Sequence, residues 1–198
     1  MKAKPIQFNG EMVRSILDGR KTQTRRVLKS FAWDIDREFD DGWPVACDYE
    51  DGSWYRVKCP YGQPGDYLWV RETFLENNEI VLFKADNPKI PPFDKWTPSI
   101  HMPRWASRIT LEIINIRVER LQDISEKDAI AEGVTDPSAG TEHEAPPGAQ
   151  YKSGPVTWFA MLWSRIHGIE SWRENPWVWA IEFKPHFVNI DKFIKDEK

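Results

Sequence analysis

The chain has 198 residues, a formal net charge of −4 and 40% hydrophobic residues. This length supports one sizeable hydrophobic core, and the negative net charge argues against a protein that binds nucleic acid over its whole surface. No apolar run approaches the length that crosses a bilayer, and the N-terminal sequence MKAKPIQFNG lacks the apolar stretch of a signal peptide. We therefore expect a single-domain cytoplasmic protein that does not enter a membrane.

The two cysteines, Cys47 and Cys59, are too few for a metal cluster of thiolates, and they do not form a Cys-x-x-Cys motif. We expect two reduced thiols and no metal or other cofactor. The alternatives are a disulfide, or a zinc site that His101 or His143 completes.

Residues 10–18 predict the first helix, because their apolar members recur at helical spacing, Asn9 can cap the N-terminus and Gly19 can end the helix. A basic segment overlaps and follows it: between residues 14 and 29, six cations accompany one anion, Asp18. Such a local patch concentrates positive potential, and it suits one phosphate or one short strand better than a long duplex. Cations are also favourable at a helix C-terminus, so the helix dipole explains part of the pattern.

Residues 30–64 show no clear period and predict an irregular acidic segment with a hairpin turn at residues 51–52. The Pro-Gly-Asp turn at residues 64–66 leads into a predicted strand over residues 67–73. On that strand Glu72 shares a face with two apolar residues, because side chains alternate along a strand. If this face is buried, the Glu72 carboxylate needs a partner.

The remaining elements are expected as a strand over residues 80–85, a long strand over 107–121, a short helix from a capping box at Ser125 to Gly133, an amphipathic helix over 157–167 and a last strand over 177–183. In the long strand the apolar residues change parity at Ile113-Ile114, which predicts a bulge. The charged tail after Pro185 is expected to fray. This order alternates too little for a parallel doubly wound sheet, so we expect an α+β fold, a small and mostly antiparallel β-barrel with peripheral helices.

Two segments carry a family resemblance: GRKTQTRR at residues 19–26 and PGDYLWVRE at residues 64–72. Together they resemble the ASCH family, whose fold is PUA-like. The family signature Gly-x-Lys-x-x-Glu-x-Arg is matched by Gly19, Lys21 and Arg26, with Thr24 at the Glu position. This Thr variant is similar to compact bacterial ASCH enzymes that hydrolyse the acyl amide of N4-acetylcytidine.

The resemblance extends further along the chain through HMPRWASRITLEI at residues 101–113 and NPWVWAIEF at residues 175–183. These segments are similar to longer ASCH proteins of phages and prophages, which mostly have no assigned activity. The resemblance implies one ASCH domain over residues 1–198, with insertions at about residues 30–60 and 134–155. The insertions distinguish the chain from the compact enzymes and leave the substrate open.

Carried over from the compact enzymes, the catalytic set falls on Lys21, Thr24 and Glu72. Amide hydrolysis needs a nucleophile, a base and a proton for the leaving amine. Thr24 would attack the acyl carbonyl, Lys21 would accept the hydroxyl proton, and Glu72 would protonate the leaving nitrogen. Because residues 21 and 24 face opposite sides of a straight strand, a bend after Gly19 must bring them together.

The residues expected to bind substrate are cations, a histidine and an aromatic near these segments: Arg20, Arg25, Arg26, Arg71, His101, Arg104 and Trp105. In the structural alternative, Lys21 and Glu72 form an ion pair, and Thr24 is an ordinary strand residue. His101 has its own alternative, a hydrogen-bonded structural role.

Three functions stay open. The first is a metal-independent hydrolase of an acylated cytidine-type amide, the second an RNA-binding module without catalysis, and the third a ribonuclease that uses the same basic pocket. In each of them the partner is RNA or a modified nucleoside.

Overall fold

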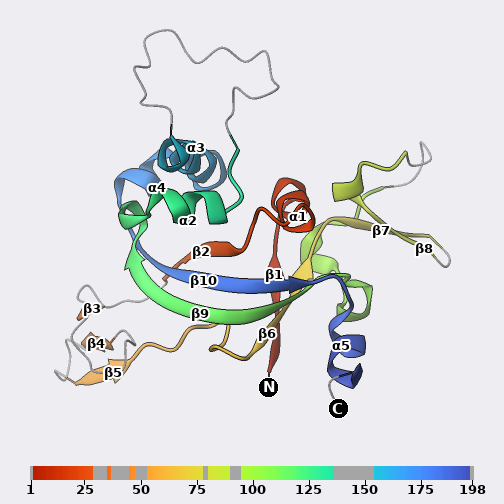
Figure 1. The fold of residues 1–198 in the computed structure, drawn as a ribbon, viewed down its shortest axis with the longest axis horizontal. Helices are drawn as coiled ribbons and strands as arrows, with labels where there is room; N and C mark the ends of the chain where they lie inside the picture. The colour runs from red at the N-terminus through yellow and green to blue at the C-terminus, as the bar shows by residue number, and fades with distance from the viewer. Residues whose placement is uncertain are drawn as a thin grey trace, which may run out of the picture. The chain divides into compact units, whose positions relative to one another are not determined.

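The computed structural model describes residues 2–28, 35–36, 45–47, 53–77, 80–89, 95–135 and 154–196, which form a mixed α+β fold (Figure 1). The strands are β1 (Ala3–Gln7), β2 (Gln23–Val27), β3 (Ile35–Asp36), β4 (Val45–Cys47), β5 (Trp54–Arg56), β6 (Tyr67–Arg71), β7 (Phe74–Asn77), β8 (Ile80–Phe83), β9 (Thr110–Arg120) and β10 (Trp177–His186). The α-helices are α1 (Gly10–Leu17), α2 (Glu126–Ala131), α3 (Pro155–His167), α4 (Ile169–Arg173) and α5 (Ile190–Asp196). Short 3-10 helices are η1 (Lys84–Asp86), η2 (Ser99–His101), η3 (Arg104–Ala106) and η4 (Leu121–Asp123). In the described part of the chain no helix combines the length and apolar character needed to cross a bilayer.

A five-stranded sheet in the order β1-β6-β9-β10-β2 carries the fold. β1 pairs with β6 in parallel, whereas β6 with β9 and β10 with β2 pair antiparallel. The α+β class is thus confirmed. The strand order has two ends, β1 and β2, so the described residues do not display the closed barrel that the sequence suggested.

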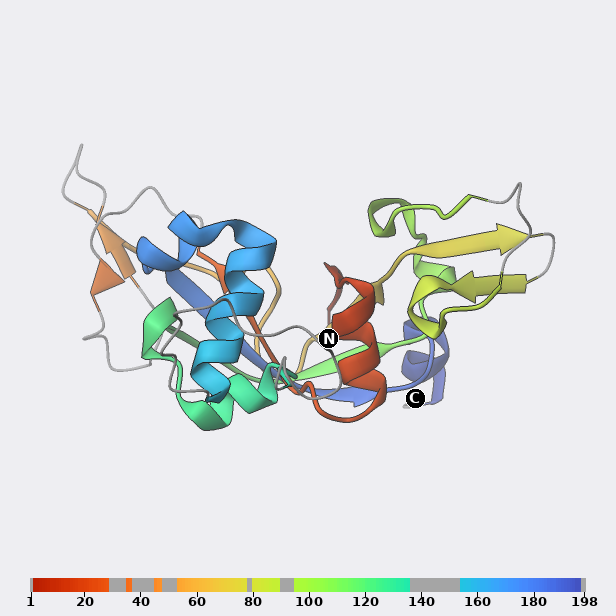
Figure 2. The ribbon, with the colours of Figure 1, turned by 90° about the horizontal axis from the view of Figure 1, so that it is seen from above.

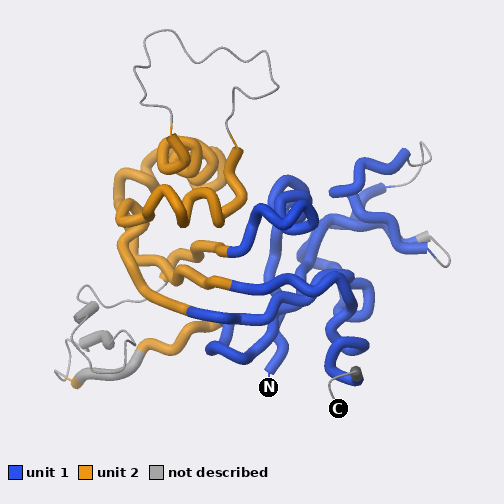
Figure 3. The backbone as a smooth tube through the Cα atoms, in the orientation of Figure 1, with its two compact units in different colours: residues 1–22, 61–115, 183–198 blue, residues 23–60, 116–182 orange. Residues whose placement is uncertain are grey.

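The chain divides into two compact units (Figure 3). Unit 1 comprises residues 1–22, 61–115 and 183–198, and unit 2 comprises residues 23–60 and 116–182. Both boundaries in the second half of the chain fall inside strands, so β9 and β10 each contribute residues to both units. Each unit has buried apolar clusters of its own.

The first helix of unit 1 forms as the sequence predicts. The Asn9 side chain accepts a hydrogen bond from the Met12 amide at 2.9 Å, which satisfies one of the open donors at the start of α1. Gly19 has φ +73°, a backbone conformation that glycine adopts without strain, and it follows the end of the helix. Val13 and Ile16 are fully buried on the apolar face.

The expectation that the tail frays is wrong. β10 continues to His186, and α5 follows it with Ile190 at 0% exposure. Ile190 packs with Tyr67 and Trp69 of β6, and Phe193 joins the same cluster. Since residues 190, 193 and 194 are apolar at helical spacing, the signal was present among the charges of the tail.

The strand expected over residues 80–85 is confirmed as β8, which pairs antiparallel with β7 (Figure 2). Phe74 at the start of this hairpin also bridges to Thr97. Beneath it, Phe74, Met102 and Ala106 form a small buried cluster, against which Val81 packs. The hairpin, η2 and η3 are thereby tied together within unit 1.

Unit 2 is built from helices against strands β2 and β10 (Figures 1 and 2). The Ser125 hydroxyl caps α2 by accepting from the Asp128 amide at 3.1 Å, and Gly168 ends α3, both as predicted. Phe159 and Trp163 of α3 pack in one cluster with Val178 of β10.

Two expectations for the remaining segments differ from the structure. The segment expected to be irregular contains a small antiparallel sheet, β3-β4-β5. The predicted turn at residues 51–52 lies outside the described residues. On β9, Ile114 is 47% exposed, so the apolar side chains do not simply move to the opposite face after Ile113. Further along β9, the charged residues Arg117 and Glu119 form ion pairs within unit 2.

We expect Ile190→Ala to lower the free energy of unfolding by about 2–5 kcal/mol, because the substitution leaves a cavity beneath α5. Chemical denaturation monitored by circular dichroism measures the change. The matched control is Ile100→Ala, whose side chain is 57% exposed in the same unit and whose loss should cost little. Equal effects of the two substitutions would show that α5 is not docked.

Candidate functional site

Glu72, directly after β6, has a buried carboxylate with a defined partner. Its side chain is 2% exposed. Arg108 donates from Nε to Oε1 at 2.8 Å and from Nη2 to Oε2 at 3.1 Å. The carboxylate that the strand pattern places on an apolar face is therefore held by a bidentate guanidinium, the strongest geometry for such a pair.

Arg108 is itself held on three sides. Its Nη1 and Nη2 donate to the two carboxylate oxygens of Asp86 at 2.7 and 2.8 Å. The guanidinium carbon lies 3.9 Å from the centre of the Phe83 ring, within cation–π range. β8, η1 and the segment before β9 thus converge on Glu72, and we refer to Glu72, Arg108, Asp86 and Phe83 as the arginine clamp.

The surroundings of Glu72 raise the pKa of its carboxyl above the ordinary glutamate value. Burial raises the pKa of its carboxyl, and although the hydrogen bond and charge of Arg108 lower that pKa, the net shift is upward. For Arg108, burial lowers the pKa, but its contacts with Glu72 and Asp86 raise it overall, so the guanidinium stays charged. A carboxyl that holds its proton more readily than an ordinary glutamate is suited to proton donation.

Lys21 is another buried charged group of unit 1, with 1% exposure. The chain turns sharply after α1, where the Arg20 and Lys21 amides both donate to the Ser15 carbonyl at 2.9 Å. The Lys21 amine lies 5.7 Å from the centre of the Phe8 ring, and Phe8 packs against Phe183. The motif at residues 19–26 therefore places the Lys21 amine in a buried position beside aromatic side chains.

Thr24 lies on β2, in unit 2, directly opposite Ile181 of β10. It is 1% exposed, and its hydroxyl has no hydrogen-bond partner among the described residues. Because side chains alternate, Thr24 faces away from its neighbours Gln23 and Arg25. Most buried hydroxyls are hydrogen-bonded, so an unsatisfied one marks a position that requires an explanation.

All three predicted catalytic residues are thus buried polar groups. Lys21 and Glu72 belong to unit 1, whereas Thr24 belongs to unit 2. The expected convergence of the three groups, and the bend that it requires, stay predictions.

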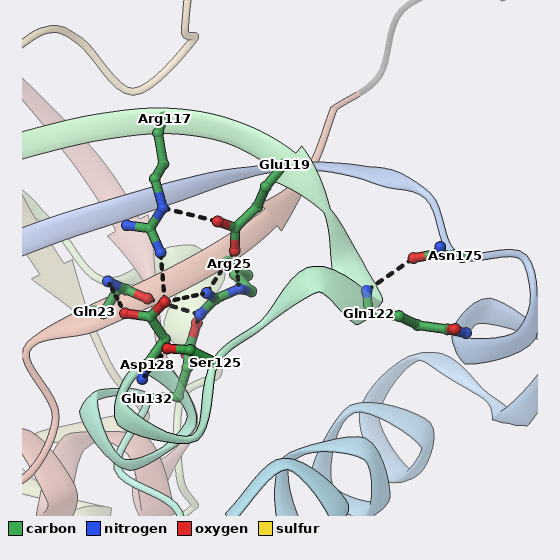
Figure 4. Close-up of polar contacts among 9 residues, drawn as sticks. All are labelled: Gln23, Arg25, Arg117, Glu119, Gln122, Ser125, Asp128, Glu132 and Asn175. Carbon is green, nitrogen blue, oxygen red and sulfur yellow. Dashed lines mark hydrogen bonds and ion pairs between the residues drawn. The ribbon is translucent and has the colours of Figure 1, made fainter.

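Arg25, expected to bind substrate, lies at the centre of an ion network in unit 2 (Figure 4). Its side chain is 0% exposed. It donates from Nε to Glu119 at 2.8 Å and from Nη1 to Glu132 at 3.1 Å and to Gln23 at 2.7 Å. Asp128 of α2 lies 3.5 Å from Nη2. The guanidinium is saturated by protein groups, which gives Arg25 a structural role in joining β2, β9 and α2.

Arg117 completes this network from β9, pairing with Glu119 at 2.7 Å and with Asp128 at 2.8 Å. Burial raises the pKa of Asp128, but the Ser125 hydroxyl and the charge of Arg117, with smaller contributions from others, hold that pKa below its ordinary value. The Asp128 carboxylate thus stays ionised at neutral pH and available to the two arginines.

Two further predicted residues hold loops of unit 1. Arg71 donates from Nε to the Met102 carbonyl at 3.1 Å and from Nη2 to the Ile100 carbonyl. Arg104 pairs with Asp191 of α5 at 2.8 Å. Both guanidiniums are positioned by these contacts beside η2 and η3.

The other predicted residues are more open. Arg20 pairs with Asp18 at 2.9 Å at the surface, and His101 and Trp105 are exposed, Trp105 to 55%. Arg26 is half-buried on β2; burial and the charge of Arg26 together lower the pKa of His167 in the same unit.

Sequence reasoning missed the partner of Glu72. The β6–β9 register pairs Trp69 with Thr110, and it carries Arg108 to the level of Arg71, one residue from Glu72. That neighbour relation requires knowledge of which strands pair, and the sequence alone does not contain it.

The described residues contain no group of three histidine, cysteine or acidic side chains that could hold a metal ion. No protein-family model matches the chain, no curated protein matches it, and no solved structure is significantly similar to it. The site must therefore be interpreted from its own chemistry.

We expect Arg25→Met to lower the free energy of unfolding by about 3–5 kcal/mol at neutral pH, because it removes the guanidinium from the buried Glu132 carboxylate and leaves Glu119 and Asp128 with Arg117 alone. The pKa of Asp128 is lowered in the fold, so its stabilising contribution is lost as pH falls through that value, and the deficit should shrink in acid. Urea denaturation across pH measures both effects. Arg173→Met is the matched control, since its pair with Glu170 is exposed and should contribute less than about 1 kcal/mol.

We expect the pKa of Glu72 to lie above the ordinary glutamate value and to rise further in Arg108→Met, because the guanidinium lowers it. Carboxyl-labelled NMR titration measures both values. Since the folded pKa exceeds the unfolded one, wild-type stability should fall as pH rises through the folded pKa, and Glu72→Gln should remove that fall. A pKa of Glu72 that does not change in Arg108→Met would contradict the arginine clamp.

Proposed function

We propose that this protein is an ASCH-family hydrolase with a PUA-like barrel, which cleaves an acyl amide on a cytidine-type nucleoside, free or in RNA, without a metal ion. Thr24 is the nucleophile, Lys21 the base and Glu72 the acid. The five-stranded, mostly antiparallel sheet and the motif at residues 19–26 support the family proposal.

The observation that carries the proposal is the Thr24 hydroxyl, which is buried and has no partner among the described residues. A buried hydroxyl without a hydrogen bond costs about 1–3 kcal/mol. Valine has nearly the same shape and would avoid that cost, so a threonine with no structural use for its hydroxyl supports a chemical use.

The proposed reaction has two halves. In the first, Thr24 Oγ1 bonds to the acyl carbon and its proton passes to the Lys21 amine, which must be uncharged to accept it. Glu72 protonates the nitrogen as the carbon–nitrogen bond breaks. In the second, water attacks the acyl ester, Glu72 accepts a water proton, and Lys21 returns its proton to the departing Thr24 oxygen. The products are the free amine and a carboxylic acid, and the raised pKa of Glu72 supports its role as acid.

We expect Thr24→Ala to lower the hydrolysis of N4-acetylcytidine by on the order of 10³-fold or more, because no other group would form the covalent intermediate. Mass spectrometry of the cytidine product measures the rate, for the free nucleoside and for acetylated RNA. Thr22→Ala is the matched control, since it removes a hydroxyl two residues away. Thr24→Val should be inactive and more stable than the wild type by about 1–3 kcal/mol, which separates loss of chemistry from loss of fold.

Four outcomes would contradict the proposal. Wild-type protein that releases no cytidine from either substrate would refute the hydrolase, and metal-independent cleavage of the RNA chain would favour a ribonuclease instead. Full activity in Thr24→Ala would remove Thr24 from the reaction. Glu72→Gln should affect the amide far more than a p-nitrophenyl ester, whose leaving group needs no proton; equal losses would argue against Glu72 as the acid.

A further inference from the structure

Unit 1 carries a surface pocket of about 560 Å³ that the proposed reaction does not use. It is lined by residues of η3, the segment before β9, the segment after β10 and α5. Two aromatic side chains in its wall are largely exposed, Trp105 at 55% and Phe187 at 60%. The volume suits a ligand of nucleotide size, and large aromatic rings in water offer faces on which a planar ring can stack.

The charge of this pocket is positive. Lys192 and Lys195 project from α5 three residues apart, on one side of the helix, and no described residue forms an ion pair with either of them. The acidic residue of the wall, Asp191, is neutralised by Arg104 at 2.8 Å. Arg108 also lines the pocket and stays charged while it holds Glu72. An anionic group is therefore the complement of this surface.

The walls of the pocket are fixed in place by Asn189. Its side-chain amide nitrogen lies 3.0 Å from the Arg104 carbonyl, 3.1 Å from that of Trp105 and 2.8 Å from that of Ser107. Its side-chain oxygen accepts from the Asp191 amide at 3.0 Å. The same residue thus holds the turn with the exposed tryptophan and the start of the helix with the two lysines. A site whose walls are held in this way loses little entropy on binding.

We propose that this pocket binds one nucleotide of a single-stranded nucleic acid, with the base stacked on Trp105 and Phe187 and the backbone phosphates on Lys192 and Lys195. Stacking aromatics beside cations that track a phosphate backbone form the usual arrangement for binding a single strand with little sequence preference. A peptide or an apolar ligand would use the rings but not the two lysines.

This inference stands apart from the proposed hydrolysis, because it concerns binding at a surface that includes none of Lys21, Thr24 and Glu72. Its test therefore measures binding without turnover. Fluorescence anisotropy of a labelled oligouridine, in RNA and in DNA form, gives the affinity as a function of salt, and unlabelled uridine monophosphate serves as competitor.

We expect Trp105→Ala to weaken binding of the oligouridine by on the order of 10-fold, through lost stacking. We expect the double substitution Lys192→Glu/Lys195→Glu to weaken it further and to reduce the slope of log affinity against log salt by about 1.4, because each phosphate contact to a single strand contributes about 0.7. Lys84→Glu, an exposed lysine of the same unit outside the pocket, is the matched control and should leave the slope nearly unchanged. Circular dichroism verifies that each variant folds.

Three results would overturn the proposal. The first is no binding of either oligonucleotide at low salt. The second is binding that Trp105→Ala and the double lysine variant leave unchanged, which would place the strand elsewhere. The third is competition by the mononucleotide at the affinity of the whole strand, which would make the occupant a free nucleotide.

Discussion

The pair between Glu72 and Arg108 is the constraint on which unit 1 depends. A carboxylate at the end of an interior strand is tolerated only because a guanidinium meets both of its oxygens, and that guanidinium is in turn fixed by Asp86 and the Phe83 ring. The interaction joins the end of β6, the β8–η1 segment and the segment before β9. It also connects the interior to the surface, since the cation that holds Glu72 forms part of the wall of the pocket beside α5.

Unit 2 also contains a buried charged side chain, Arg25, which is paired with more charged groups than Glu72 is. Arg25 faces the helices, since its guanidinium carbon lies 5.7 Å from the centre of the Phe159 ring of α3, a position where an apolar residue would be the simpler choice. Three carboxylates, Gln23 and Arg117 surround it, so the cost of burying its charge is offset by hydrogen bonds of good geometry (Figure 4). The side chain of its neighbour Thr24 points to the opposite face, and its hydroxyl has no hydrogen-bond partner among the described residues. Adjacent residues of one strand thus differ sharply: Arg25 has several hydrogen-bond partners, and the Thr24 hydroxyl has none among the described residues.

Local features of this fold could be predicted from the sequence because their causes are local. Asn9 and Ser125 cap helices through contacts within three residues, and the apolar residues of α3 and β10 recur in the sequence at the spacing of a helix and of a strand. Pro5 obscured β1, which is a strand at the sheet edge, where a missing amide donor matters less. The contacts of the site were harder to predict from the sequence, because the partners are far apart in the chain. Arg108 is 36 residues from Glu72 and Glu132 is 107 residues from Arg25, so each pair meets only once the chain has folded.

The hydrogen bonds of the Asn189 side chain make this part of unit 1 sensitive to a chemical change of one residue. A carboxamide supplies two hydrogens, yet its nitrogen lies near three carbonyl oxygens, so the group works only as a donor at that end. Spontaneous deamidation would replace it by an aspartate, which has no hydrogen to offer and would place a negative charge among three electron-rich oxygens. The chemical ageing of a single side chain would then leave η3 tied to α5 by the exposed Arg104–Asp191 pair, and would loosen the placement of Trp105 relative to the two lysines.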